Sequence, residues 1–141
     1  MKKLLIIALV LLSALAWAGK QESVDELKAR AEKANRKDQV ELYTKIAERQ
    51  LEALDQAYDG GTLQQARQAL SDVVNYAVKA AEASSATGKR MKKTEIAMRK
   101  MSLRLEAIRK TLDIDDRAPV GEAVQKLEAA RTDLLHHMFR K

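Results

Sequence analysis

Positively charged side chains are concentrated in one stretch of the chain, residues 88–110. This stretch holds nine Lys or Arg residues and two acidic residues, so its net charge is +7. Apolar residues recur in it at steps of three and four, which predicts an amphipathic helix with one basic face. Such a helix suits an anionic surface, so this face is the candidate binding site. The candidate site residues are Lys89, Arg90, Lys92, Lys93, Arg99, Lys100 and Arg104.

The charge of this stretch narrows its expected partners to anionic lipid headgroups, lipopolysaccharide phosphates or an acidic envelope protein. Nucleic acid is disfavoured because the stretch lacks aromatic side chains that could stack on bases. A solvated face of a bundle helix is the alternative interpretation of the same charges. The sequence leaves that alternative and the oligomeric state open.

Residues that could bind a metal are present, but their spacing is unfavourable. Three methionines carry thioethers that suit Cu(I), although core packing also explains their helical spacing: Met91, Met98 and Met101. His136 and His137 are adjacent, so on a helix they point about 100° apart and chelate one ion poorly. Asp133 and His137 are the one pair with suitable helical spacing. We therefore expect no metal and no cofactor.

Catalytic motifs are missing from the chain. The absence of cysteine excludes thiolate nucleophiles, disulfides, iron–sulfur clusters and covalently attached haem. There is no glycine-rich phosphate loop, no GxSxG and no HExxH motif. The acids at 113–116 are not followed by the glycine and glutamate of an EF-hand loop. The sequence therefore predicts a protein that is not an enzyme.

The elements that position the basic face are predicted to be helices throughout. Helix-forming residue types dominate the composition, and the alternating apolar runs typical of strands are absent. Glycine and proline breakers divide the chain into segments. We expect a short helix over about 23–35 and longer helices over about 38–58, from 62 onward, over 88–112 and from 119 onward.

Local signals mark the ends of the longer helices. Thr62 and Gln65 have the spacing of a capping box. The pair Gly60-Gly61 predicts a left-handed helix end before them. Pro119 predicts the first position of the last helix, after a polar connector at 113–118.

Apolar stripes predict the buried face of each long helix. The stripe of the 38–58 helix is Tyr43, Ile46, Ala47, Gln50, Leu54, Ala57 and Tyr58. The next is Leu63, Ala66, Leu70, Val73, Val74 and Ala77. The basic helix has a heptad seam of Met91, Thr94, Met98, Met101, Leu105, Ile108 and Leu112. The last stripe is Val120, Val124, Leu127, Leu134 and Met138.

Short joins between these helices predict antiparallel neighbours. We expect an all-α fold in which four main helices form an antiparallel up-down bundle, with an open stack of helical hairpins as the alternative. The short first helix has a capping-box signal at Ser23 and Glu26 but few apolar residues, so we expect it to dock weakly.

The first residues of the chain have the three-part pattern of a secretory signal peptide. Lys2 and Lys3 precede an uncharged stretch, Leu4 to Ala18, that ends in small residues. A transmembrane anchor is the alternative, but a span needs about 20 apolar residues. We expect cleavage near Ala18 and a periplasmic or secreted protein. The expected parts are a signal peptide at 1–18, a short helix and linker at 19–37, and a helical bundle at 38–141.

The stretch from about Tyr43 to Ala80 resembles one helical hairpin of the tetratricopeptide type. The residues that carry the resemblance are Leu54, Gly61, Ala66, Leu70 and Val73. The resemblance implies a helical interaction surface, although no second copy follows at the repeat length.

Taken together, these features predict an exported, non-enzymatic helical interaction or scaffold module. Two alternatives remain: a periplasmic bundle that binds a metal or haem, and an envelope chaperone. The size and compartment are similar to those of small periplasmic helical chaperones. Four-helix haem proteins use a methionine near the start of the bundle, and no methionine lies between residues 19 and 90 here.

Overall fold

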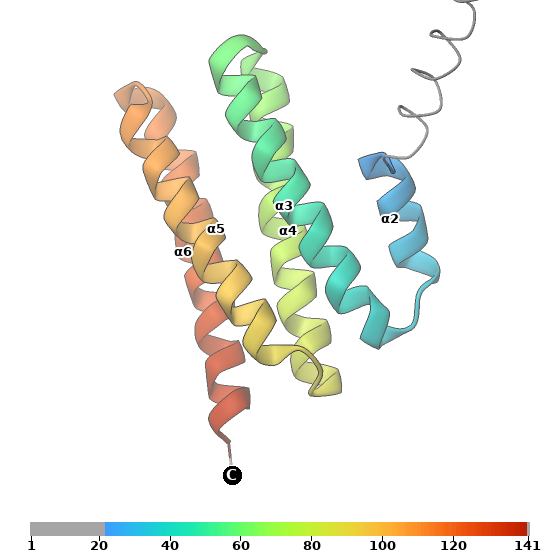
Figure 1. The fold of residues 1–141 in the computed structure, drawn as a ribbon. Coiled ribbons are helices and arrows are strands. Elements are labelled where there is room, and N and C mark those ends of the chain that lie inside the picture. Colours follow the sequence, from blue (N-terminus) through green and yellow to red (C-terminus); the bar gives the residue numbers. More distant parts are fainter. Residues whose placement is uncertain (1–21, 141) are drawn as a thin grey trace, which may run out of the picture.

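The computed structural model describes residues 22–140, which form five helices (Figure 1). They are α2 (Val24–Lys33), α3 (Arg36–Gly60), α4 (Leu63–Thr87), α5 (Met91–Thr111) and α6 (Ile114–Phe139). The predicted class is confirmed: this region is all-helical, with one short helix before four long ones. None of these helices combines the length and hydropathy that a membrane span requires. The predicted signal peptide lies outside the described residues.

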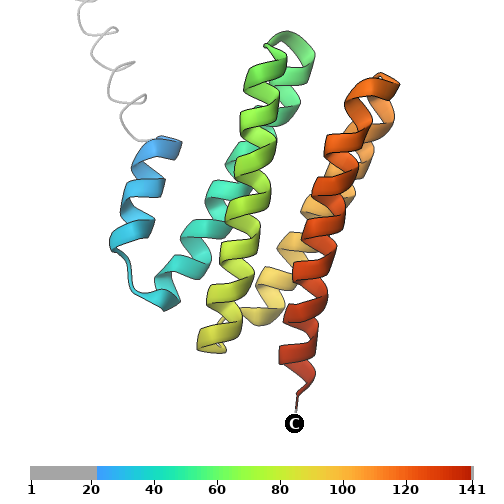
Figure 2. The ribbon, with the colours of Figure 1, turned by 180° about the vertical axis from the view of Figure 1, so that it is seen from behind.

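The four long helices form two antiparallel hairpins that lie side by side (Figures 1 and 2). One hairpin pairs α3 with α4 and the other pairs α5 with α6. Helix α3 lies beside α5 and α4 lies beside α6, whereas α3 and α6 do not touch. The predicted antiparallel neighbours are therefore confirmed. The order around the bundle is that of stacked hairpins, the alternative arrangement, because a simple up-down ring requires contact between α3 and α6.

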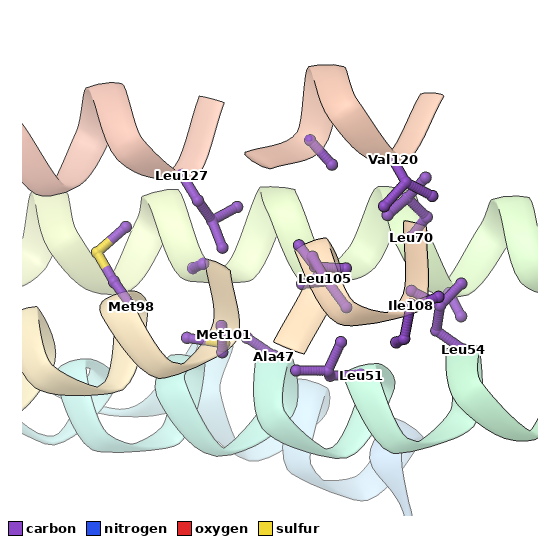
Figure 3. Close-up of a cluster of buried hydrophobic side chains, with 14 of the residues drawn as sticks. Ala47, Leu51, Leu54, Leu70, Met98, Met101, Leu105, Ile108, Val120 and Leu127 are labelled. Carbon is purple, nitrogen blue, oxygen red and sulfur yellow. The ribbon is translucent and has the colours of Figure 1, made fainter. Parts of the chain in front are cut away.

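One apolar core joins all four long helices (Figure 3). Leu54, Leu70, Leu105 and Leu127 contribute to it from α3, α4, α5 and α6 respectively. The predicted seam of α5 is confirmed, since its five central members are buried: Thr94, Met98, Met101, Leu105 and Ile108. The seam therefore fixes which side of the basic helix faces solvent.

Helix α3 buries more of its surface than the predicted stripe. Ile46 and Leu54 are buried as expected, but Val40, Leu42 and Leu51 are buried as well. The reason is that α3 lies between α2 and the rest of the bundle, so it packs on two sides. Ala47 of the stripe is also buried, and the other four members are only partly buried: Tyr43, Gln50, Ala57 and Tyr58.

Helix α4 packs against α3, α5 and α6. Its buried face consists largely of small side chains, which let neighbouring helices approach closely: Ala66, Ala69, Ala77, Ala80, Ala81 and Ala83. The prediction that Leu63 is buried is wrong. Leu63 is 45% exposed because it begins α4, where residues 61–65 are all exposed.

Gly60 belongs to α3, and Gly61 caps the helix with φ −98° and ψ −160°. The predicted left-handed end is therefore wrong, because this backbone is extended. Glycine is required by space instead: a Cβ on Gly61 would lie 2.7 Å from Gln65 Oε1 and 2.9 Å from Ala57 Cα. The approach is close because Gln65 takes part in the predicted capping box. The backbone N–H of Thr62 donates to Gln65 Oε1 at 3.0 Å, and that of Gln65 donates to Thr62 Oγ1 at 3.1 Å.

Helix α6 begins at Ile114, five residues before Pro119. The predicted connector at 113–118 and the predicted start at Pro119 are therefore wrong. Asp113 is the N-cap, and Asp115 and Asp116 lie in the first turn. Negative charges near a helix N-terminus interact favourably with its dipole, which favours the earlier start.

The short helix α2 packs against α3 through a small apolar face. Ser23 Oγ accepts a hydrogen bond from the backbone N–H of Glu26 at 3.1 Å, one of the two bonds of the predicted capping box. Leu27 is fully buried. Lys28 Nζ reaches α4 and lies 2.7 Å from Asp72 Oδ2. This ion pair joins residues 44 apart in sequence and supplements the apolar face, a contact that the sequence did not predict.

Candidate functional site

The seven predicted site residues are all exposed, and two of them precede α5. Lys89 and Arg90 form the corner between α4 and α5, after Gly88 with φ +67°. Arg90 is itself left-handed, with φ +57°. The corner is fixed by Ser84, whose hydroxyl donates to the carbonyl of Lys89 at 2.6 Å. The basic helix therefore starts from a defined turn.

Two site arginines form ion pairs with acids of α3. Arg90 Nη2 lies 3.0 Å from Glu41 Oε2, and Arg104 pairs with Asp55. Each pair joins residues 49 apart in sequence, so the parallel helices α3 and α5 run in register. The positive charge of these two arginines is largely balanced within the molecule.

A groove of about 460 Å³ runs between α3 and α5. Its floor is apolar, and its walls have opposite charge. The floor includes Leu51, Ala97 and Met101, the α3 wall includes Glu48 and Glu52, and the α5 wall includes Lys93, Lys100 and Arg104. Burial raises the pKa of Glu48 above its usual value, and the positive charge of Lys100 offsets only part of this increase. The groove therefore lacks the uniform positive charge that an anion requires.

The side of α5 that faces solvent carries the remaining site residues. We call it the outward face, and it comprises Lys92, Lys93, Ile96, Arg99, Lys100, Leu103 and Lys110. Residues seven apart lie two turns along the same line of a helix. Three such lines run along this face: Lys92 with Arg99, Lys93 with Lys100, and Ile96 with Leu103 and Lys110. Two basic lines thus flank a line that begins with two apolar residues and ends with Lys110.

Both acids of α5 are neutralised by arginines. Glu95 is only 7% exposed, and its Oε1 accepts a hydrogen bond from Nε of Arg131 on α6 at 2.8 Å. Glu106 lies 3.0 Å from Arg109 on α5 itself. Within residues 22–140, no ion pair involves any cation of the outward face. The outward face is therefore positive, although Glu48 and Glu52 stand on the opposite wall of the groove from Lys93 and Lys100.

Sequence reasoning missed the partners of Arg90 and Arg104 and the exposure of Leu103, which is 67%. A signal for the partners exists, because Glu41, Glu48 and Asp55 recur every seven residues on α3. The exposure of Leu103 could have been inferred because this leucine does not belong to the heptad seam that packs into the core.

The residues considered for metal binding are distributed between the core and the C-terminal end. Met98 and Met101 are buried in the core, as their spacing predicted. His136 and His137 are exposed on the last turns of α6. His137 Nδ1 lies 2.9 Å from the backbone carbonyl oxygen of Asp133. Over residues 22–140 there is no group of three or more His, Cys, Asp or Glu residues that could hold a metal ion.

A second polar cluster lies where α2, α3 and α4 meet. Asp72 Oδ2 accepts hydrogen bonds from Lys28 Nζ at 2.7 Å and from Gln50 Nε2 at 2.6 Å. Burial lowers the pKa of Lys28, but the hydrogen bond and charge of Asp72 outweigh it and raise that pKa above 10.5. Lys28 Nζ also lies 5.3 Å from the ring centroid of Tyr76. Asp72 of α4 accepts hydrogen bonds from both α2 and α3, so this cluster links the three helices.

No known protein family, curated protein or solved structure matched the chain. The interpretation of the site therefore rests on its geometry and charge. Arg90 and Arg104 form ion pairs with α3, whereas the cations of the outward face of α5 form none in the described region.

Proposed function

We propose that the protein is an exported, non-enzymatic interaction module that binds an anionic surface through the outward face of α5. One observation carries the proposal: none of the five cations on this face has an ion-pair partner in the described region, whereas both acids of α5 are held by arginines. These cations are Lys92, Lys93, Arg99, Lys100 and Lys110. A face with clustered cations and no acid attracts polyanions over a distance of about 10 Å at moderate salt.

The rest of the molecule supports a scaffold role. Small side chains of α4 line the core, and the groove between α3 and α5 has walls of opposite charge. Export follows from the signal-peptide pattern of residues 1–18 and places anionic lipids and lipopolysaccharide within reach of the protein. Residues 19–141 carry a net charge of +4, so the outward face is more positive than the average surface.

Charge reversal tests the proposal on residues 19–141, which include every described helix. The variant Lys92→Glu, Lys93→Glu, Arg99→Glu and Lys100→Glu is compared with the unaltered chain on heparin resin and on phosphatidylglycerol vesicles. We expect the apparent affinity for both surfaces to fall more than about 100-fold, since each cation near an anionic surface contributes about 1 kcal/mol.

A matched control changes the net charge by the same amount at other exposed positions: Lys33→Glu, Arg36→Glu, Lys37→Glu and Lys126→Glu. This variant should retain most of the binding. The proposal fails if the unaltered chain binds neither surface, or if the two variants lose binding equally, because net charge alone then explains it.

A further inference from the structure

Leu103 differs from the other exposed large apolar residues of the described region. Leu63, Ile114 and Phe139 are the first or last residues of their helices, where exposure is ordinary. Leu103 lies in the middle of α5, yet 67% of its surface is exposed. Its exposure is therefore a property of the helix face and not of a helix end.

Cations flank Leu103 on its own helix. Arg99 and Lys100 precede it by four and three residues, which places them on the adjacent turn. Ile96, half-buried at the edge of the groove, precedes it by two turns. Lys110 follows it by two turns. An apolar line bordered by long basic side chains is thus the centre of the outward face.

We infer that the outward face of α5 binds a lipid bilayer with anionic headgroups and inserts Leu103 at the headgroup–acyl boundary. This inference rests on the proposed function and names the anionic surface. Lysine and arginine have apolar stems, so their charged heads reach the phosphates while the stems and Leu103 contact the acyl region. A polar polyanion offers no apolar phase for Leu103.

The insertion is shallow, because Leu103 and the partly exposed Ile96 are the only large apolar side chains of the outward face that can enter the bilayer. The five central seam residues, on the other side of α5, stay in the core. Helix α5 then lies parallel to the bilayer plane, as amphipathic interfacial helices do. No rearrangement of the two hairpins is needed.

Fluorescence tests the insertion directly. The only tryptophan of the chain is Trp17, so residues 19–141 contain none, and Leu103→Trp introduces a single probe. On phosphatidylglycerol vesicles we expect the emission of Leu103→Trp to shift to the blue and to be quenched by brominated acyl chains. Phe139→Trp, at a 76% exposed position at the end of α6, is the matched control and should show neither effect.

Affinity tests the energetic part. Leu103→Ser should weaken binding to phosphatidylglycerol vesicles about tenfold, because it removes a large apolar group from the contact. Its retention on heparin resin should not change, and Phe139→Ser should alter neither. Circular dichroism of each variant checks that the helices persist.

The outcomes separate the inference from the proposed function. If vesicles bind but Leu103→Ser has no effect and Leu103→Trp emission does not move, insertion is excluded and the anionic-surface function stands. If heparin binds but anionic vesicles do not, the lipid partner is excluded and the wider function stands. If neither surface binds, both fall.

Discussion

Gly60 and Gly61 are adjacent, but only the second position lacks space for a larger side chain. Gly60 is helical, and a Cβ there would meet no atom within 4 Å. Gly61 has an ordinary negative φ, but a Cβ there would meet the backbone of Ala57 and the side chain of Gln65. Space, and not backbone conformation, therefore makes the second position specific for glycine.

We predict that Gly61→Ala destabilises the protein by about 1–3 kcal/mol, the usual cost of forced overpacking. Gly60→Ala should instead stabilise it by about 0.5–1 kcal/mol, because alanine loses less backbone entropy in a helix. Urea unfolding followed by circular dichroism measures both. Equal effects of the two substitutions would contradict the packing explanation.

The sequence predicted the chemistry of single residues unevenly. The capping role of Thr62 and Gln65 is confirmed, because both groups lie within one turn and need no distant partner. The neutralisation of Arg90 and Arg104 was not predicted, because Glu41 and Asp55 lie on another helix. Composition reveals how many charges a segment carries, but tertiary contacts decide which of them face solvent unpaired.

At the scale of a helix, Pro119 is the least favourable feature of α6. It is the sixth residue of the helix, beyond the first turn in which a missing N–H costs nothing. The backbone carbonyl of Asp115, four residues earlier, therefore has no helical donor.

We expect Pro119→Ala to stabilise the protein by about 1–3 kcal/mol, because alanine restores this hydrogen bond and removes the ring clash. Denaturant unfolding at equilibrium measures the change. If the helix instead began at Pro119, the substitution would bring no gain. Pro119 is exposed, so the smaller alanine side chain leaves no cavity in the core.

Periodic elements were predicted better than their ends. The seam of α5 was correct because seven apolar or small residues at heptad spacing leave one face to bury. The start of α6 was misplaced because proline is favoured at a first helical position, a local preference that the acidic first turn overrides here. The second buried side of α3 depends on α2, so the stripe of α3 alone could not reveal it.

At the scale of the molecule, the alanine-rich face of α4 sets how closely the two hairpins approach. Ala77 is fully buried on this face. A larger side chain there pushes α4 away from its neighbours, and the strain is shared by both hairpins because one core connects them.

We predict that Ala77→Leu destabilises the whole molecule by about 1–3 kcal/mol while unfolding remains a single transition. Ala86→Leu, at an exposed position of the same helix, is the control and should change stability by less than about 0.5 kcal/mol. Thermal unfolding by calorimetry distinguishes one transition from two. Separate transitions for the two hairpins would contradict the shared core.

The class and helix count were predictable because composition and spacing determine them locally. The side-by-side order of the hairpins was not, because both orders join antiparallel neighbours through equally short turns. The two orders differ in whether α3 lies beside α5. The ion pairs between acids of α3 and arginines of α5, each joining residues 49 apart, are the sequence feature that indicates this contact.

The positions of Met98 and Met101 have a consequence for oxidation. Met98 is fully buried, so an oxidant such as peroxide reaches its thioether only when the bundle opens, whereas Met101 lies on the floor of the groove between α3 and α5. Met91 and Met138 are half-buried and react from the closed protein. Conversion to the sulfoxide makes these side chains polar, which disfavours their return to the core. A sulfoxide at Met98 therefore identifies a molecule whose bundle has opened at least once.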